Sequence, residues 1–257
     1  MSFETIVTET DGNVRTITLD RPDAGNALDT STLEELTEAL EAADSDDAVH
    51  AVILAANGNV FVAGSDLDEM KSYDPASYIG YLDSFNETMN TIRAVDVPVV
   101  AAVDGPAYGG GNILVGATDL AVAGESTSFG QQEINVGIVG GAELVQDLPR
   151  KVVNEIVMLG EPFSADRARE LGLVNRVVSD SKVDATVTQL AEKLAAKPQV
   201  ALAVGKRAIR AAEDAGPLGI ETMEAFGLSL CFGTDDQVEG MEAFLENREP
   251  EFTDTIG

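Results

Sequence analysis

Three short apolar runs, each ended by a glycine-containing turn, most constrain what this chain can fold into. They span residues 51–56, 97–103 and 120–123. A short run without polar alternation is typical of a strand that is covered on both faces. Each run is followed by a segment with helical periodicity, and strands that alternate with helices build a sheet with helices against it. The sequence therefore predicts an α/β fold.

The N-terminal segment has a different pattern. Residues 5–9 and 14–20 alternate apolar and polar side chains around a turn at 11–13, which favours a β-hairpin. After the hairpin, leucines recur at helical spacing, so we expect a helix that is capped by Thr30 or Ser31.

The C-terminal segment shows only helical periodicity. It covers residues 199–247, with breaks at Gly216 and Gly233. Its helices are too few and short to form a core of their own, so we expect them to pack on the core or on a neighbouring chain. We therefore predict a core with the binding cleft over residues 1–197 and a helical appendage over 198–257.

The chain is strongly acidic. Its 45 aspartate and glutamate residues outnumber 16 lysine and arginine residues, which gives a net charge of −29 at pH 7. Such a surface repels phosphate backbones, which excludes nucleic acid as a partner. The acids are spread through periodic segments, which argues against a disordered acidic tail. We interpret the excess as that of a protein from a salt-loving organism, because a Debye length of about 3 Å at molar salt screens self-repulsion.

The sequence gives no indication of a membrane span or of export. No run approaches the roughly 18 consecutive apolar residues of a spanning helix. The first residues lack the basic start and apolar run of a secretory signal. The single cysteine, Cys231, excludes an internal disulfide and fits a reducing compartment. We expect a cytoplasmic protein without a membrane partner.

Most familiar catalytic motifs are absent. His50 is the single histidine and precedes a predicted buried strand, so we interpret it as structural. A Ser-His-Asp triad and a His/Cys metal site therefore have no support. The glycine-rich turns lack the lysine of a phosphate-binding loop and the acidic residue of a dinucleotide fingerprint.

Two glycine-rich turns remain as candidates for chemistry. Residues 61–67 and 104–111 each follow a predicted strand and precede a helix-like segment. Glycines at such turns expose backbone N–H groups, and the helix N-terminus adds positive potential. Two N–H groups that converge on one point form an oxyanion hole. Taken singly, each turn is also explained as a tight connection between a strand and a helix.

Five segments, taken in order, are specific for one enzyme family. They are LDRP (19–22) with NAL (26–28), FVAGSDL (61–67), GPAYGGG (105–111), FGQQE (129–133) and EGMEAFLENR (239–248). In these segments the chain resembles the enoyl-CoA hydratase/isomerase (crotonase) family. The resemblance implies a crotonase-like spiral of ββα units, with a helical C-terminal appendage that joins homotrimers or hexamers.

The resemblance also implies an acyl-CoA substrate and a role for each candidate residue. The backbone N–H groups of Ser65 and Gly110 would bind the thioester oxygen, and Glu133 would act as acid/base. In the enolate that forms, each N–H donor stabilises the charge by about 3–4 kcal/mol. CoA would lie along the first turn, near the following residues: Ala24, Ala63, Asp66, Leu67 and Asp68. Since CoA is part of the substrate, no metal or further cofactor is implied.

One position departs from the hydratases of this family. These carry a second glutamate two residues after the glycine triplet, where this chain has Ile113. Water addition is easiest with two carboxylates, whereas moving a proton from the α to the γ carbon needs one base. We therefore predict isomerisation of a 3-enoyl-CoA to the 2-enoyl-CoA with Glu133 as the base.

Other functions stay open. Hydration of a 2-enoyl-CoA requires a second acid beside Glu133, either Glu143 or an acid that the sequence does not identify. We interpret Glu143 first as a residue at a helix start. Decarboxylation or hydrolysis of an acyl-CoA uses the same oxyanion hole. Outside the enzymes, the alternative is a catalytically silent acyl-CoA-binding protein, against which the intact Glu133 argues.

The acidic composition predicts salt dependence. At molar KCl the chain should be folded and assembled, and in dilute buffer it should loosen or dissociate because its like charges are less screened. Circular dichroism and sedimentation velocity in both buffers measure this. Identical spectra and sedimentation coefficients would contradict our interpretation of the charge.

Overall fold

The computed structural model describes residues 3–213 and 215–254. Its strands are β1 (Ile6–Asp11), β2 (Val14–Leu19), β3 (Ala51–Ala56), β4 (Val99–Val103), β5 (Ala107–Tyr108), β6 (Leu120–Gly124), β7 (Ser128–Gly130), β8 (Phe163–Ser164) and β9 (Arg176–Val178). Six strands form the main sheet in the order β1-β2-β3-β4-β6-β9, and the small sheet has the order β5-β7-β8. In the main sheet β1 and β2 pair antiparallel, and all other neighbours are parallel.

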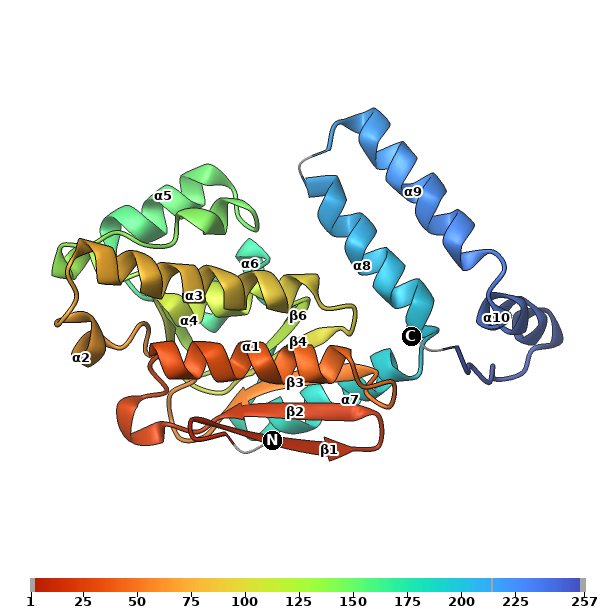
Figure 1. Ribbon diagram of the computed structural model, residues 1–257, viewed down its shortest axis with the longest axis horizontal. Coiled ribbons are helices and arrows are strands. Elements are labelled where there is room, and N and C mark those ends of the chain that lie inside the picture. The colour runs from red at the N-terminus through yellow and green to blue at the C-terminus, as the bar shows by residue number, and fades with distance from the viewer. Residues whose placement is uncertain (1–2, 214, 255–257) are drawn as a thin grey trace.

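Helices cover this sheet and extend beyond it (Figure 1). They are α1 (Thr30–Asp44), α2 (Leu67–Met70), α3 (Pro75–Ala94), α4 (Gly110–Ala117), α5 (Arg150–Leu159), α6 (Ala165–Leu171), α7 (Val183–Ala195), α8 (Gln199–Glu213), α9 (Pro217–Cys231) and α10 (Asp235–Glu246). Short 3-10 helices are η1 (Pro22–Ala24), η2 (Glu133–Val136), η3 (Ala142–Val145) and η4 (Asp180–Lys182). Among the described residues no helix combines the length and apolar character needed to cross a membrane.

The central strands are buried on both faces, as their apolar runs predict. In β3, Val52 and Leu54 belong to the larger core cluster, to which α1 and α3 contribute. The alternate residues Ala51 and Ile53 belong to the second cluster, which includes Val187 of α7. Successive side chains of a strand point to opposite faces, so one continuous apolar run supplies both layers.

The predicted hairpin and strands are confirmed, with two local corrections. β1 and β2 pair around Gly12, whose φ of +56° suits a tight turn. Helix α1 is capped by Asp29 and not by Thr30 or Ser31, because the Asp29 carboxylate accepts the N–H of Thr32. The run at 97–103 forms a strand only from Val99, since the preceding Pro98 has no N–H for the ladder.

The appendage is a helical arm that leaves the sheet after α7. The predicted division at residue 197 falls in the connection between α7 and α8. Lys206 of α8 ties the arm to the core, because its Nζ donates to the carbonyls of Ile92 and Val97 at 3.2 Å each. Figure 1 shows α9 beside α8, with α10 at the far end of the arm.

Large apolar side chains of the arm face away from the rest of the described chain. Phe226 is 68% exposed, Leu230 65% and Phe244 82%. Of the two packing partners expected for these helices, the core and a neighbouring chain, the core does not cover these three side chains. Exposed apolar patches of this kind mark contacts between chains. We therefore expect a second copy of the chain to cover them, in line with the predicted trimer or hexamer.

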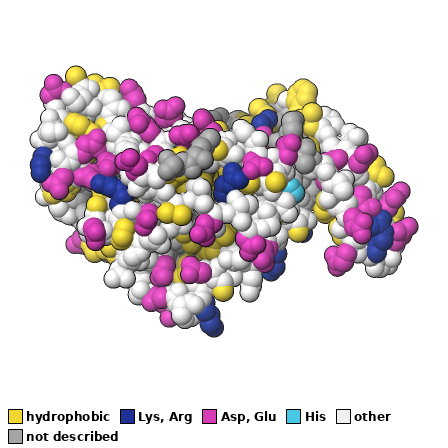
Figure 2. Space-filling model, turned by 60° about the horizontal axis from the view of Figure 1, so that its bottom comes forward, with side chains coloured by type: hydrophobic (Ala, Val, Ile, Leu, Met, Phe, Trp, Pro, Cys, Tyr) yellow, Lys and Arg dark blue, Asp and Glu magenta, His cyan; other side chains and the backbone are white. Residues whose placement is uncertain are grey.

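Acidic side chains predominate among the charged residues of the surface. In Figure 2, Asp and Glu side chains are scattered over the visible face and far outnumber those of Lys and Arg. This distribution is that of a solvated acidic surface without a basic patch on the face shown.

The exposed arm predicts that assembly depends on its apolar side chains. Phe226→Asp combined with Phe244→Asp should convert the assembled protein at molar KCl into monomers, because charge replaces apolar contact. Sedimentation velocity measures the species present. Met158→Asp on α5, which changes an equally exposed side chain elsewhere, is the control and should leave assembly intact. A wild-type chain that sediments as a monomer contradicts the prediction.

Candidate active site

The two glycine-rich turns meet at a cavity of about 250 Å³. Ser65 of the first turn and Gly110 of the second both line it, as do Glu133 and Glu143. The remaining wall is largely apolar and includes Leu67, Tyr81, Phe85, Ile113 and Val136. A concave apolar site with a few convergent polar groups is the usual form of a small-molecule site.

Two isolated parallel bridges fix the first turn. Leu28 pairs with Ser65, and Val62 pairs with Ala107 of β5. The Leu28 N–H donates to the carbonyl of Gly64 at 2.8 Å, and the Tyr108 N–H donates to the carbonyl of Val62 at 2.9 Å. The turn is thereby held on both sides by backbone, which leaves little freedom in the direction of its N–H groups.

The N–H groups of Ser65 and Gly110 are free for a ligand. Across residues 3–213 and 215–254, neither donates a hydrogen bond to a protein acceptor. Gly110 is the first residue of α4, where the helix end adds positive potential. Two unpaired donors at one cavity are the arrangement that an oxyanion hole requires.

The glycine triplet permits this close packing. Gly109 has a φ of +52°, and a Cβ built there would lie 2.7 Å from Oε1 of Glu133. A Cβ on Gly111 would lie 2.6 Å from the Cβ of Val62. Any larger residue at these positions would move the acid or the first turn, so the triplet is a packing requirement as well as a turn.

Glu133 is a half-buried acid at the start of η2. Its Oε1 accepts a hydrogen bond from Nε2 of Gln131 at 2.9 Å, and Gln131 in turn accepts one from Asn112 at 3.1 Å. Its Oε2 is buried without a protein partner among the described residues. Burial raises the pKa of Glu133 above its usual value, and the bonds from its own backbone N–H and from Gln131 oppose that rise.

Glu143 reaches the same cavity from η3. It lies in the first turn of that short helix, as the interpretation of a helix-start residue requires, and it also lines the cavity. One of its carboxylate oxygens is 4.0 Å from the guanidinium of Arg93. Burial raises the pKa of Glu143, and the charge of Arg93 opposes that rise.

The structure divides the predicted CoA contacts into two groups. Ala63 and Leu67 line the cavity. Ala24 lies exposed beside it, since the Ala63 N–H donates to the carbonyl of Gly25, the next residue.

Asp66 and Asp68 do not line the cavity. Asp66 caps α2 through the N–H groups of Asp68 and Glu69 and pairs with Arg21 at 3.0 Å. Burial alone would raise the pKa of Asp66, but these partners hold it below its usual value. The exposed Asp68 pairs with Lys71. Both carboxylates are therefore engaged within the chain.

Three side chains of α3 that the sequence analysis did not assign a role lie at or beside the site. The Tyr81 hydroxyl donates to the carbonyl of Leu28 at 3.0 Å. A Cβ on Gly110 would lie 3.0 Å from the Phe85 ring, so this ring packs on the second turn. Arg93 contacts Glu143. The available signal was spacing: residues 81, 85, 89 and 92 mark the buried face of a helix, and Arg93 stands at its edge.

The remaining histidine and the acids supply no second site of this kind. The Nδ1 atom of His50 lies 3.2 Å from the carbonyl oxygen of Ala195, away from the cavity, which agrees with a structural role. Within the described part of the chain, no three His, Cys, Asp or Glu side chains are grouped to hold a metal ion.

If the N–H group of Gly110 binds the thioester oxygen, its removal should slow turnover, and a matched pair of substitutions at Gly110 tests this. Gly110→Pro removes one donor at a helix position that accepts proline, whereas Gly110→Ala keeps the donor and adds a similar Cβ against Phe85. Turnover of an acyl-CoA thioester should be about 100- to 1000-fold lower in the proline variant than in the alanine variant. Ser65→Ala keeps its N–H and should change turnover little. Equal rates for the two Gly110 variants would remove this donor from the mechanism.

The family comparison covers nearly the whole chain. The sequence model described as "Enoyl-CoA hydratase/isomerase" matches residues 9–255. The "Probable enoyl-CoA hydratase" of Rhizobium meliloti is 38% identical over 98% of this chain and 99% of its own length. The "Crotonyl-CoA hydratase" of Syntrophomonas wolfei is 34% identical with the same coverage.

Solved structures agree with the sequence comparison. An enoyl-CoA hydratase from Mycobacterium smegmatis superposes with a TM-score of 0.94 at 35% identity, over 97% of this chain and 99% of its own. One from Geobacillus kaustophilus gives a TM-score of 0.92 at 36% identity, over 98% of both chains. The predicted crotonase-like α/β fold is confirmed. The chain therefore belongs to the enoyl-CoA hydratase/isomerase family.

Proposed function

We propose that this protein adds water across the double bond of a 2-enoyl-CoA thioester. The observation that carries the proposal is that Glu133 and Glu143 line one cavity together with the free N–H groups of Ser65 and Gly110. Hydration is easiest with two carboxyl groups, and Glu143 can supply the one that Ile113 does not. The names of the relatives described above also favour hydration over the predicted isomerisation.

The oxyanion hole activates the substrate. When the thioester oxygen accepts the N–H groups of Ser65 and Gly110, electron density moves from the double bond toward that oxygen as water attacks the β carbon. The two donors and the start of α4 stabilise the enolate charge. Because the first turn is held by backbone on both sides, these donors are already oriented before the substrate binds.

The environments of the two glutamates assign their roles. Glu133 is half-buried, and no cation pairs with it among the described residues, so the neutral form is favoured there. Glu143 lies 4.0 Å from Arg93, whose charge favours the ionised form. Burial raises the pKa of both carboxyl groups, and within the described residues only Glu143 has a cation nearby that opposes the rise, a difference of the kind that divides acid from base. Glu143 therefore accepts a proton from the attacking water, and Glu133 donates its proton to the α carbon.

Isomerisation is the second candidate, and Ile113 favours it. This apolar residue lines the cavity and is 5% exposed at the position where the hydratases carry their second glutamate. Glu133 alone can move a proton between the α and γ carbons of a 3-enoyl-CoA above the same oxyanion hole. A catalytically silent acyl-CoA-binding protein would retain the cavity but show no turnover of either substrate.

The wider features of the proposal follow from the same site. Acyl-CoA is the substrate partner, and the reaction needs no metal or redox cofactor, because the oxyanion hole polarises the thioester. Assembly through the helical arm, a cytoplasmic location and a salt-loving source stay predictions.

Two amide substitutions test the assignment. Glu133→Gln and Glu143→Gln should each lower hydration of crotonyl-CoA by about 100- to 10,000-fold, the usual contribution of a general acid or base. Glu155→Gln, which alters an exposed acid on α5, should be silent. Substrate absorbance follows hydration, and chromatography identifies the products.

A 3-enoyl-CoA assay separates the two candidates. In the hydratase proposal, Glu143→Gln abolishes water addition but leaves any movement of the double bond by Glu133 intact. A wild-type chain that isomerises the 3-enoyl-CoA, does not hydrate the 2-enoyl-CoA and is indifferent to Glu143→Gln would replace hydration by isomerisation.

A further inference from the structure

The inference concerns Arg93, a buried cation that no step above explains. Arg93 lies in the last turn of α3, and its side chain is only 9% exposed. Removing a guanidinium from water is costly unless nearby groups compensate. Within residues 3–213 and 215–254 its guanidinium donates no hydrogen bond to protein, and its one ion pair is with Glu143. Within the described residues, the one ion pair that compensates the buried charge of Arg93 is therefore the pair with Glu143, at the active-site cavity.

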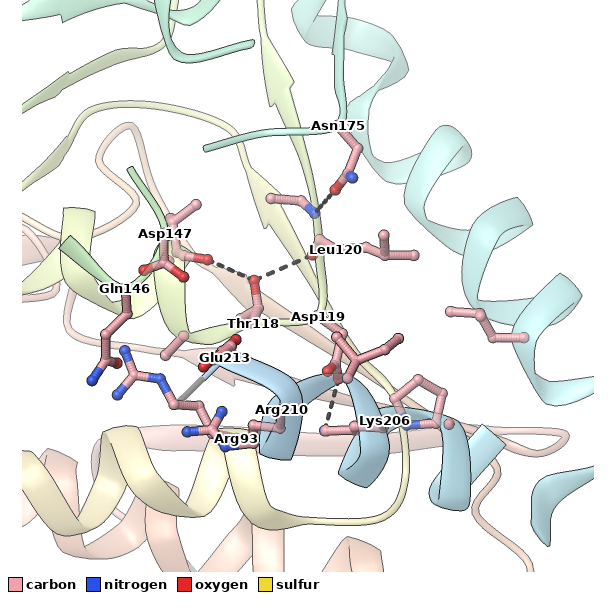
Figure 3. Close-up of a pocket in the computed structure, with 18 of the residues that line it drawn as sticks. Arg93, Thr118, Asp119, Leu120, Gln146, Asp147, Asn175, Lys206, Arg210 and Glu213 are labelled. Atoms are coloured by element: carbon pink, nitrogen blue, oxygen red, sulfur yellow. Dashed lines mark hydrogen bonds and ion pairs between the residues drawn. The ribbon is translucent and has the colours of Figure 1, made fainter. Parts of the chain in front are cut away.

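Arg93 also forms part of the wall between two cavities. Glu143 lines the active-site cavity. Arg93 lines a second cavity of about 490 Å³ between α8 and the core, shown in Figure 3. The ion pair between them crosses this wall, so it links the active site to charges that the substrate does not touch.

The second cavity contains its own charged groups. Lys206 pairs with Asp119, and Asp96 pairs with Arg207 at the edge. Three charged side chains lie there without an ion pair inside the described ranges: Asp147, Arg210 and Glu213. Burial raises the pKa of Asp147 to about 6, and Arg93 opposes that rise. Burial and the like charge of Arg93 lower the pKa of Arg210.

The geometry of the pair suits a positioning role. At 4.0 Å, with no hydrogen bond between the groups, Arg93 attracts the carboxylate of Glu143 without occupying its oxygens. A charge-assisted hydrogen bond, with its usual distance of about 2.7–2.9 Å, would occupy a lone pair of the carboxylate. The carboxylate oxygens of Glu143 are left free to accept a proton from water.

We propose that Arg93 is a positioning residue for the reaction: from behind the wall, its guanidinium favours the ionised form of Glu143 and keeps the carboxylate directed into the active-site cavity. The proposal rests on the proposed function, because it takes Glu143 to be the base. It makes the second cavity an electrostatic support of the active site, to which α8 of the helical arm contributes Arg210 and Glu213. The other titratable groups that face Glu143 across the active-site cavity are Glu133, Tyr78, Tyr81 and Tyr108.

The pH dependence of hydration tests the proposal, because a purely structural role of Arg93 would not shift the pH at which activity is lost. The base must be ionised, so activity is lost on the acid side as pH falls through the pKa of Glu143. Removal of a cation raises that pKa. In Arg93→Gln the acid limb of the kcat profile for crotonyl-CoA should therefore move up by about one pH unit or more, the effect of losing an opposite charge at such a distance. Activity should recover at higher pH.

Three further variants serve as controls. Arg93→Lys keeps the charge on a shorter side chain and should restore most of the acid limb. Arg207→Gln removes a cation of α8 that pairs with Asp96 and not with Glu143, and it should leave the limb in place. In a Glu143→Gln background, Arg93→Gln should have no further effect on the residual activity.

The outcomes distinguish this inference from the proposed function. Absence of hydration in the wild-type chain would overturn both. A second outcome overturns the role of Arg93 alone: Glu143→Gln abolishes hydration, but Arg93→Gln shifts the acid limb no more than Arg207→Gln does. Should Arg93→Gln not fold, the neutral variant Arg93→Met decides by the same measurement: an upward shift of the acid limb supports the proposal, and an unmoved limb overturns it.

Discussion

The active-site cavity depends on a backbone constraint: two turns that follow neighbouring parallel strands are tied together by single β-bridges. Parallel strands end at the same edge of a sheet, so the chain leaves β3 and β4 side by side. The bridge between Val62 and Ala107 then joins the two turns, and the bridge between Leu28 and Ser65 holds the first turn from its other side. The direction of two N–H groups is thus fixed by the sheet and not by any side chain. An active site of this kind tolerates much change in sequence around it, which fits the 34–38% identity to its relatives.

Burial beside the oxyanion-hole turns, and not the number of acids, distinguishes the two glutamates that line the active-site cavity. The chain has 45 acidic residues, most of them solvated and some paired with neighbouring cations, such as Asp68 with Lys71. An apolar wall partly removes Glu133 and Glu143 from water, and both line the active-site cavity, whereas the buried Asp96 and the partly desolvated Asp147 line the second cavity. A carboxyl group in that setting responds strongly to a single nearby charge, because little solvent screens it. The scarcity of cations elsewhere makes the buried Arg93 more informative than a surface arginine would be.

Much of the fold could be predicted because its helices, strands and turns depend on sequence patterns of neighbouring residues. The apolar run of β3, the hairpin turn at Gly12 and the glycine triplet each depend on residues close together in the chain. Glu133 was found through its motif. The helix cap was missed because Asp29, Thr30 and Ser31 are all good caps, and the choice depends on which side chain reaches an N–H group.

The rest of the site was less accessible to sequence reasoning because it depends on tertiary contacts. The pairing of Arg93 on α3 with Glu143 on η3 joins residues 50 positions apart in sequence. The engagement of Asp66 with Arg21 likewise required the structure. Whether the C-terminal helices pack on the core or on a neighbouring chain was open from the sequence, and the exposure of Phe226 and Phe244 favours the neighbouring chain.

The positions of Ile113 and Glu143 on different kinds of element bear on how this chain could acquire or lose an activity in evolution. Ile113 is buried in α4 among core residues, so an acid there must be accommodated by the whole packing arrangement. Glu143 stands on a short 3-10 helix at the edge of the cavity, and its one ion-pair partner among the described residues is the buried Arg93. An acid at this edge can therefore be gained or lost together with a single buried cation, without remodelling the sheet and its helices. The scaffold and the choice of reaction are thereby separated, so that selection can act on one while the other is preserved.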